Sequence, residues 1–268
     1  DSMQTYNRSF LTGKHANTQV PQYIGFIRIA QEEGTSTTNR YRVAAKNFWK
    51  DVAENRTVCI GGNSMYEHFI SENDGVQYVN VADGPESCNS NNMLKLSEDL
   101  FDDTHDSRYA DFYEGTMYNH MLSTIDPETG GYVYFTPLRP QSYRIYSKVN
   151  QDMWCCVGTG MENHVKYGHF TYTHTDNTLF VNLFTPSTLD ADDYALTQET
   201  QFPDEQGTKL TLRKGGNFTL AIRKPSWVAE GYAILVNGAK TDYVLDHGYA
   251  TIERSWKKGD VVEVALPM

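Results

Sequence analysis

Up to about residue 170, apolar side chains recur along the chain at the spacing of amphipathic helices. "STTNRYRVAAKNFWKDVAEN" shows the pattern most clearly, because a Ser/Thr-rich start precedes apolar positions that lie three or four residues apart. The other stretches with this spacing are "QVPQYIGFIRIAQEE", "NNMLKLSEDLF", "SRYADFYEGTMYNHML" and "GMENHVKYGHF". We therefore predict five helices, the earliest with Pro21 in its first turn, where a missing N–H costs little.

Beyond this point the spacing changes to the alternation of β-strands. "FTYTHTDNTLFVNLFTPS" alternates on both sides of Asp176-Asn177, a hairpin-like turn. Later strand-like stretches are "NFTLAIRKPSW", "AILVNG", "YATIERSW" and "DVVEVALPM". We predict an α + β multidomain chain, with a helical domain over residues 1–174 and an antiparallel β-sandwich over 175–268. Because the last strand stops at Met268 without a polar tail, we expect a fragment with an incomplete sandwich.

The composition favours a folded protein with a neutral ligand. Of the 268 residues, 39% are hydrophobic, which is enough to build real cores. A net charge of -11 argues against nucleic acid and anionic membranes as partners, and no apolar run approaches the roughly 20 residues that insert across a bilayer. The 18 tyrosines offer the flat faces and hydroxyl tips that sugar sites use. The sequence leaves open whether the protein forms a homo-oligomer. It also leaves open whether the protein is located in the bacterial periplasm or in the cytoplasm.

Two short motifs could together bind a metal ion. Glu86 and Cys88 are separated by one residue, and Cys155 and Cys156 are adjacent, which prevents them from forming an ordinary disulfide. Three thiols and one carboxylate would supply a four-coordinate zinc site, and so many sulfur ligands favour zinc over magnesium or calcium. The spacing is not that of a zinc ribbon, so these cysteines could also be small buried hydrophobic residues.

Several longer motifs resemble one known family. They are "GKHANTQVPQYIGF", "GGNSMYEHF", "ESCNSNNMLKLSEDLF", "YADFYEGTMYNHMLSTIDPETGGYVYFTPL" and "MWCCVGTGMENHVKYGHF". Together they resemble glycoside hydrolase family 127, the β-L-arabinofuranosidase-like group formerly called domain of unknown function 1680. The later "IRKPSW" and "RSWKKGDVVEVALPM" resemble the β-sandwich that follows the catalytic domain in that family. The resemblance implies an (α/α)6 toroid, of which residues 1–174 would be the C-terminal half.

The resemblance also implies roles for single residues and an oligo- or polysaccharide substrate. The implied zinc ligands are Glu86, Cys88, Cys155 and Cys156, and Cys155 would also be the nucleophile. Glu67 would be the general acid/base, and His15 and Tyr134 would bind the sugar. A retaining glycosidase usually has two carboxylates, and here a thiolate would replace one of them. Some family members have a histidine where this chain has Met153-Trp154, so the sugar specificity stays open.

Other interpretations of these residues remain. Zinc could be a purely structural staple in a carbohydrate-binding or scaffold module, or it could activate water as in a metallohydrolase, which requires an open coordination position. Glu67 could instead complement a helix N-terminus. We predict Cys59 in "TVCIGG" to be a buried thiol, and the "GG" and "GTG" stretches to be turns. The histidines without ligand spacing are predicted to be packing or surface residues, namely His68, His164 and His169.

Overall fold

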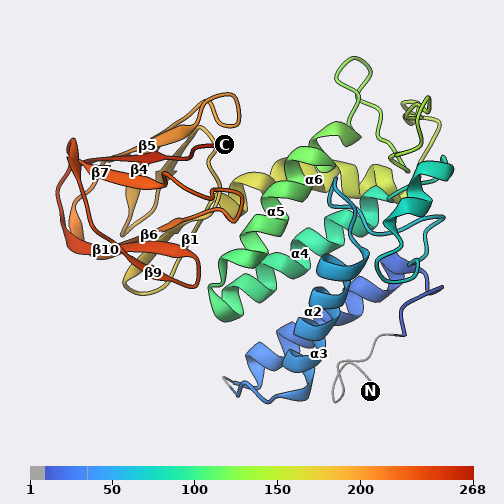
Figure 1. The fold of residues 1–268 in the computed structure, drawn as a ribbon, viewed down its shortest axis with the longest axis horizontal. Helices are drawn as coiled ribbons and strands as arrows, with labels where there is room; N and C mark the ends of the chain where they lie inside the picture. The colour runs from blue at the N-terminus through green and yellow to red at the C-terminus, as the bar shows by residue number, and fades with distance from the viewer. Residues whose placement is uncertain (1–9, 35) are drawn as a thin grey trace. The chain divides into compact units, whose positions relative to one another are not determined.

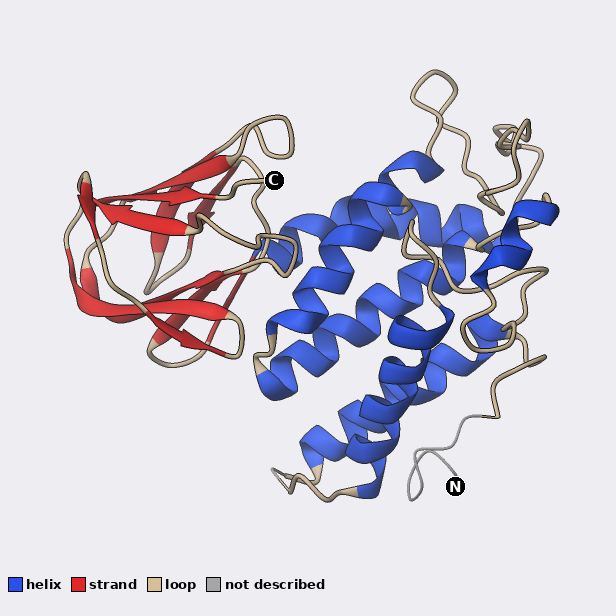
Figure 2. Ribbon diagram, in the orientation of Figure 1, coloured by secondary structure: helices blue, strands red, loops and turns tan. Residues whose placement is uncertain are grey.

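The computed structural model describes residues 10–34 and 36–268, which form two compact units (Figure 1). The first unit comprises the residues up to His105 together with Phe112–Val165, and the second comprises Asp106–Asp111 together with Lys166–Met268. Figure 2 shows that the first is helical and that the strands belong to the second. The predicted fold class is therefore confirmed: a helical region is followed by a sandwich-like pair of sheets.

Three helices form the core of the first unit. α2 (Ala16–Glu32) packs against both α3 (Arg40–Asp51) and α4 (Ser87–Thr104). α3 begins at Arg40 because the Asn39 side chain accepts hydrogen bonds from the first free N–H groups of the helix, including that of Tyr41 at 2.9 Å. In α4 the apolar positions predicted from spacing are buried, namely Met93, Leu96, Leu100 and Phe101.

The remaining helical elements include three short ones. They are the π-helical η1 (Val52–Arg56) and the 3-10 turns η2 (Gly75–Asn80) and η3 (Met121–Thr124). α5 (Ser107–Asn119) and α6 (Cys155–Thr171) are full helices. α6 begins five residues before the predicted stretch at 160–170, so the "GTG" sequence is helical and the prediction of a turn there is wrong. Gly158 and Gly160 lie inside α6. The helix therefore extends back to the cysteine pair, which lies in its first turn.

A buried ion pair connects α3 to α4. Arg42 Nε lies 2.8 Å from Asp103 Oδ1, and the two side chains are only 5% and 7% exposed. The same guanidinium donates to the carbonyl oxygens of Gly34 and Ala30 at 2.9 and 3.1 Å. A desolvated charge of this kind is tolerated only while its partners remain in place.

The second unit is built from two sheets. One has the order β1 (Tyr172–His174), β2 (Thr178–Val181), β6 (Gly216–Arg223), β10 (Tyr249–Trp256) and β9 (Val244–Asp246). The other has the order β3 (Ser187–Asp190), β4 (Ala195–Glu199), β5 (Gly207–Leu212), β11 (Val261–Ala265), β7 (Ala233–Val236) and β8 (Ala239–Lys240).

Along strands such as β5, every second side chain is buried, and these buried side chains form the core of the sandwich. In β5 the side chains of Thr208, Leu210 and Leu212 are buried while their neighbours are half-buried. The turn between β7 and β8 has φ angles of 53° at Asn237 and 79° at Gly238, the left-handed pair that Asn-Gly accommodates in a tight hairpin. One pairing differs from the predicted antiparallel pattern, because β2 runs parallel to β6.

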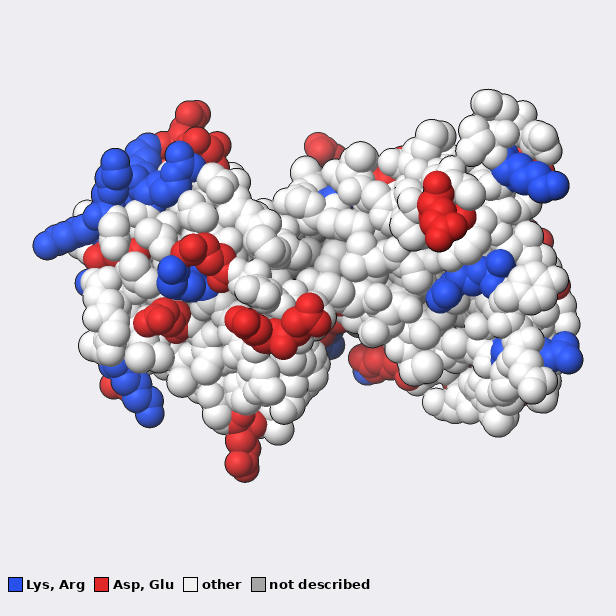
Figure 3. Space-filling model, turned by 90° about the horizontal axis from the view of Figure 1, so that it is seen from above, with Lys and Arg blue, Asp and Glu red and all other residues white. Residues whose placement is uncertain are grey.

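The acidic excess is not gathered on the face drawn in Figure 3. There, lysine and arginine side chains lie in small groups between aspartates and glutamates, and wide stretches carry neither. Some opposite charges pair directly, as Lys209 does with Glu199 at 2.6 Å. Interleaved charges give this face no continuous basic band of the kind that binds a phosphate backbone.

We expect Arg42→Ala to lower the free energy of unfolding by about 3 kcal/mol, because the buried Asp103 carboxylate then keeps, among the described residues, only Lys46, at 3.0 Å, and the carbonyl oxygens of Gly34 and Ala30 lose their donor. Arg28→Ala is the matched control. Arg28 also pairs with an α4 aspartate, Asp99, but its side chain is 66% exposed, so its loss should cost less than about 1 kcal/mol. Urea unfolding of both variants measures the difference, and equal losses would contradict the assignment of the buried pair as the stabilising one.

Candidate active site and metal centre

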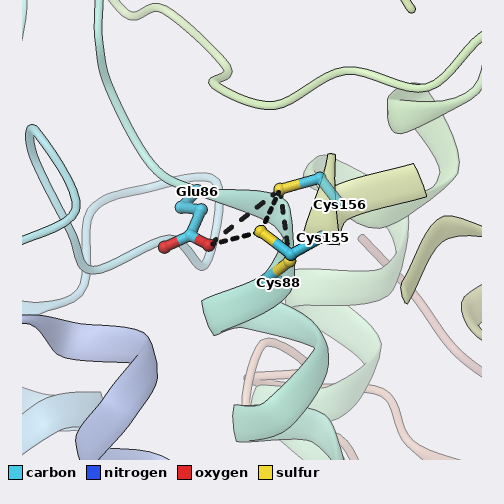
Figure 4. A group of neighbouring side chains, drawn as sticks. All are labelled: Glu86, Cys88, Cys155 and Cys156. Atoms are coloured by element: carbon cyan, nitrogen blue, oxygen red, sulfur yellow. Dashed lines mark hydrogen bonds between the residues drawn. The ribbon is translucent and has the colours of Figure 1, made fainter. Parts of the chain in front are cut away.

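Four side chains converge at one point of the first unit (Figure 4). One ligand atom from each of Glu86, Cys88, Cys155 and Cys156 lies within 4.8 Å of the other three. The Sγ atoms of Cys88 and Cys156 are 3.2 Å apart, and Glu86 Oε1 lies 3.9 Å from the Sγ atoms of Cys155 and Cys156. Residues about 70 positions apart in the sequence are thus brought into one cluster.

Both halves of the cluster come from helix N-termini. Glu86 is the N-cap of α4 and Cys88 lies in its first turn, while Cys155 and Cys156 begin α6. The Glu86 side chain makes no capping hydrogen bond, so its carboxylate is available to the cluster. Because the positive end of a helix favours negative charge and lowers the pKa of a thiol, these positions suit metal-binding thiolates.

The protonation of the cluster is set by its burial and its short contacts. The hydrogen bond that the Cys88 thiol donates to Cys156 lowers the pKa of Cys156 to about 6. The same contact, together with burial, raises the pKa of Cys88 well above its usual range. Burial raises the pKa of Glu86 to about 8, and the second oxygen of this carboxyl group, Oε2, is buried without a hydrogen-bond partner. This donor set fits a metal ion, which would replace the protons and satisfy the orphaned oxygen.

The remaining predicted site residues lie beside the cluster. The Tyr134 hydroxyl donates a hydrogen bond to Glu67 Oε1, and Cys155 Sγ lies 3.9 Å from that hydroxyl. His15 Nε2 lies 3.9 Å from Glu67 Oε2, and the His15 and Glu67 side chains are each 35% exposed. Burial raises the pKa of Tyr134, so its hydroxyl keeps the proton that it donates. Tyr134 therefore connects the Glu67 carboxyl group to the Cys155 thiol.

Not every sequence interpretation agrees with this arrangement. Glu67 lies in a tight turn and is not itself the first residue of a helix, although its carbonyl oxygen accepts the N–H of Ala16 at the start of α2. Cys59 is exposed, which contradicts the predicted buried thiol, because the turn closed by the Gly61 N–H to Val58 O bond points it outward. His164 stacks on Tyr132, with ring centroids 6.2 Å apart.

Two residues near the cluster were not singled out from the sequence. Thr159 Oγ1 lies 3.2 Å from Cys88 Sγ, and it lies one helical turn after the cysteine pair. Helical spacing would have pointed to Thr159 if "GTG" had been recognised as part of a helix. No motif or spacing in the sequence points to His120. It is fully buried between Ser90 Oγ and Thr136 Oγ1, each 3.0 Å from a ring nitrogen.

Comparison with known proteins agrees with this geometry. The family profile "Beta-L-arabinofuranosidase, GH127 catalytic domain" matches residues 2–169, and "Beta-L-arabinofuranosidase, GH127 middle domain" matches residues 178–268. The chain belongs to the GH127 family. A non-reducing end β-L-arabinofuranosidase of Bifidobacterium longum is 24% identical to the chain over 247 residues, which are 84% of the chain and 36% of that relative.

Solved GH127 structures share the fold. A GH127 β-L-arabinofuranosidase from Geobacillus stearothermophilus T6 superposes with a TM-score of 0.79 at 25% identity, over 95% of the chain and 42% of that structure. A second GH127 β-arabinofuranosidase has the same TM-score at 23% identity, over 100% of the chain and 46% of its own length. The chain thus spans half or less of the length of these relatives. Among the described residues, none of the helices combines the length and apolarity needed to cross a membrane.

We expect His120 to make the folded state sensitive to acid. Burial lowers its pKa from 6.5 to about 3 in the folded chain. Between these values the unfolded chain binds a proton that the folded chain does not, so stability is lost as the pH falls from 6.5 towards 3, by at most about 1.4 kcal/mol per pH unit. Urea unfolding at several pH values should show this slope in the wild type and a shallower one in His120→Asn. Identical slopes would contradict a buried neutral histidine.

Proposed function

We propose that the native protein is a retaining glycoside hydrolase that removes a terminal β-L-arabinofuranoside-like sugar from an oligo- or polysaccharide. One observation carries the proposal: Tyr134 connects the Glu67 carboxyl group to the Cys155 thiol at the edge of the metal-binding cluster. Membership of GH127 and the relative named as a β-L-arabinofuranosidase support it. We also propose that residues 1–174 form the C-terminal half of an (α/α)6 toroid and residues 175–268 the sandwich domain.

The metal that we propose is Zn²⁺, held by Glu86, Cys88, Cys155 and Cys156. Three sulfur atoms and one carboxylate oxygen suit zinc better than magnesium or calcium. When bound, zinc would keep the cysteine sulfurs as thiolates at neutral pH. Since the chain itself supplies four ligands, a tetrahedral ion would have no open position for water, which argues against a metallohydrolase.

Exposure within the cluster argues for chemistry rather than a structural staple alone. Glu86 and Cys88 are 1% exposed and Cys156 is 0% exposed. Cys155 is exposed, so it alone of the four could reach a substrate. A closed structural zinc site does not need an exposed ligand, whereas a nucleophile must be exposed to reach its substrate.

The proposed reaction needs two displacements at the anomeric carbon. The Cys155 thiolate attacks this carbon while Glu67 gives its proton to the departing glycosidic oxygen, which breaks the C–O bond. Glu67 then accepts a proton from water, the water oxygen bonds to the anomeric carbon, and Cys155 leaves as a thiolate. The Tyr134 hydroxyl orients the Glu67 carboxyl group, and His15 lies where it can bind a sugar hydroxyl.

We expect Cys155→Ala to abolish hydrolysis of 4-nitrophenyl β-L-arabinofuranoside, because no nucleophile remains. Glu67→Gln should lower kcat by about 10²–10⁴-fold, because the amide cannot accept the proton of the attacking water in the second displacement. Steady-state kinetics of the native protein measure both effects. Mass spectrometry of the wild type with a slow substrate should find a sugar covalently attached to Cys155. Full activity of Cys155→Ala would refute the proposed nucleophile.

We also expect the purified protein to contain about one zinc ion per chain, and Cys88→Ser to lose it, because a hydroxyl is a much weaker zinc ligand than a thiolate. Cys59→Ser is the control, since it removes an exposed cysteine that lies outside the cluster. Elemental mass spectrometry measures the metal in all three proteins. Zinc retained by Cys88→Ser, or lost from Cys59→Ser, would contradict the ligand assignment.

A further inference from the structure

The backbone that carries Glu67 has an unusual conformation. Residues 65–68 form a tight turn, closed by hydrogen bonds from Met65 N to His68 O at 2.9 Å and from His68 N to Met65 O at 3.0 Å. Both central residues are left-handed, with φ of 48° at Tyr66 and 65° at Glu67. Turns of this type usually contain Asn-Gly, because other side chains are unfavourable there. Contacts from outside the turn must therefore hold it in place.

Neighbouring segments supply three of these contacts. The Tyr66 N–H donates to Asp83 O at 3.1 Å, and Glu67 O accepts from Ala16 N at 2.7 Å. His15 and His68 pair across an isolated β-bridge. These bonds satisfy the Tyr66 N–H and the Glu67 carbonyl oxygen, and none of them involves the carbonyl of Tyr66.

The His68 side chain completes the turn. Its Nδ1 lies 2.5 Å from the carbonyl oxygen of Tyr66. Because a carbonyl oxygen can only accept a hydrogen bond, Nδ1 must carry a proton, and the neutral ring has its lone pair on Nε2. The His68 ring also meets the His15 ring edge to face, with centroids 5.5 Å apart. His68 thus contacts both the turn that carries Glu67 and the histidine that faces the Glu67 carboxyl group.

We propose that His68 is a positioning residue for Glu67. This inference rests on the proposed function, in which Glu67 is the general acid/base. His68 touches no reacting atom. Its Nδ1–H bond to Tyr66 holds the left-handed turn, so that the carboxyl group stays aimed at Tyr134. Since His68 is exposed, replacing it should leave the fold intact but slow the proton transfer by Glu67.

Three substitutions separate this role from a general structural one. His68→Asn keeps an N–H donor close to the position of Nδ1, His68→Gln moves the donor to the position of Nε2, and His68→Leu removes it. His174→Leu is the matched control, because His174 is also exposed and its Nδ1 also lies near a backbone carbonyl, that of Thr175 at 3.3 Å, in the second unit.

The measurement is kcat/KM of the native protein and each variant on two glycosides. Methyl β-L-arabinofuranoside has a poor leaving group that needs a proton, whereas 4-nitrophenyl β-L-arabinofuranoside has a good one that does not. We expect His68→Gln and His68→Leu to lose about 10-fold or more on the methyl glycoside and less than about 3-fold on the nitrophenyl glycoside. His68→Asn and His174→Leu should stay within about 3-fold of the wild type on both.

The outcomes separate the inference from the proposed function. An active wild type whose His68→Leu variant is unimpaired, or equally impaired on both glycosides, would overturn the positioning role alone. A wild type that hydrolyses neither glycoside would overturn the proposed function and the positioning role with it. Nitrogen-15 NMR of labelled histidines is an independent check, and a neutral His68 protonated on Nε2 would overturn the hydrogen bond on which the inference depends.

Discussion

The structure of the site depends on the meeting of two helix N-termini. α4 and α6 bring one carboxyl group and three thiols within 4.8 Å of one another. So many groups that can become negative are stable at this distance only if protons or a cation neutralise them. The helix ends contribute partial positive charge, and burial together with the neighbouring thiols raises the pKa of Glu86 and Cys88, which favours their protonated forms. Binding of a cation is therefore coupled to release of those protons.

Two kinds of backbone position the side chains at this site: helix starts and a left-handed turn. The four groups of the cluster lie at the starts of α4 and α6, and α4 packs against both α2 and α3. Glu67 is instead carried by a left-handed turn that several neighbouring segments hold. Buried His120 connects the start of α4 to the segment around Thr136, because Ser90 belongs to the first turns of α4 and the Thr136 N–H donates to the carbonyl of Pro85. A site supported in this way keeps its geometry without help from a ligand.

Burial divides the cluster into a protected and a reactive part. Cys88, Cys156 and Glu86 are shielded, so their protonation is governed by one another. Cys155 shares the same cluster and remains exposed. The Tyr134 hydroxyl lies between this thiol and Glu67, so the proposed nucleophile and the proposed proton donor share one hydrogen-bonded path. This arrangement distinguishes the site from a staple that merely joins two helices.

The sequence by itself determined the elements and the kinds of ligand. Helical spacing marks the buried face of α4, alternation marks β7, and Asn237-Gly238 marks the hairpin that follows β7, because each pattern is local. Only the tertiary structure decided which segments meet. Glu86 and Cys156 are 70 positions apart, and periodicity says which face of a helix is buried but not what covers it. The same reason explains why the place of His120 escaped prediction, because Ser90 and Thr136 come from separate segments. The errors at Cys59 and "GTG" are local ones: a turn exposes Cys59, and Gly158 and Gly160 continue a helix that glycines usually interrupt.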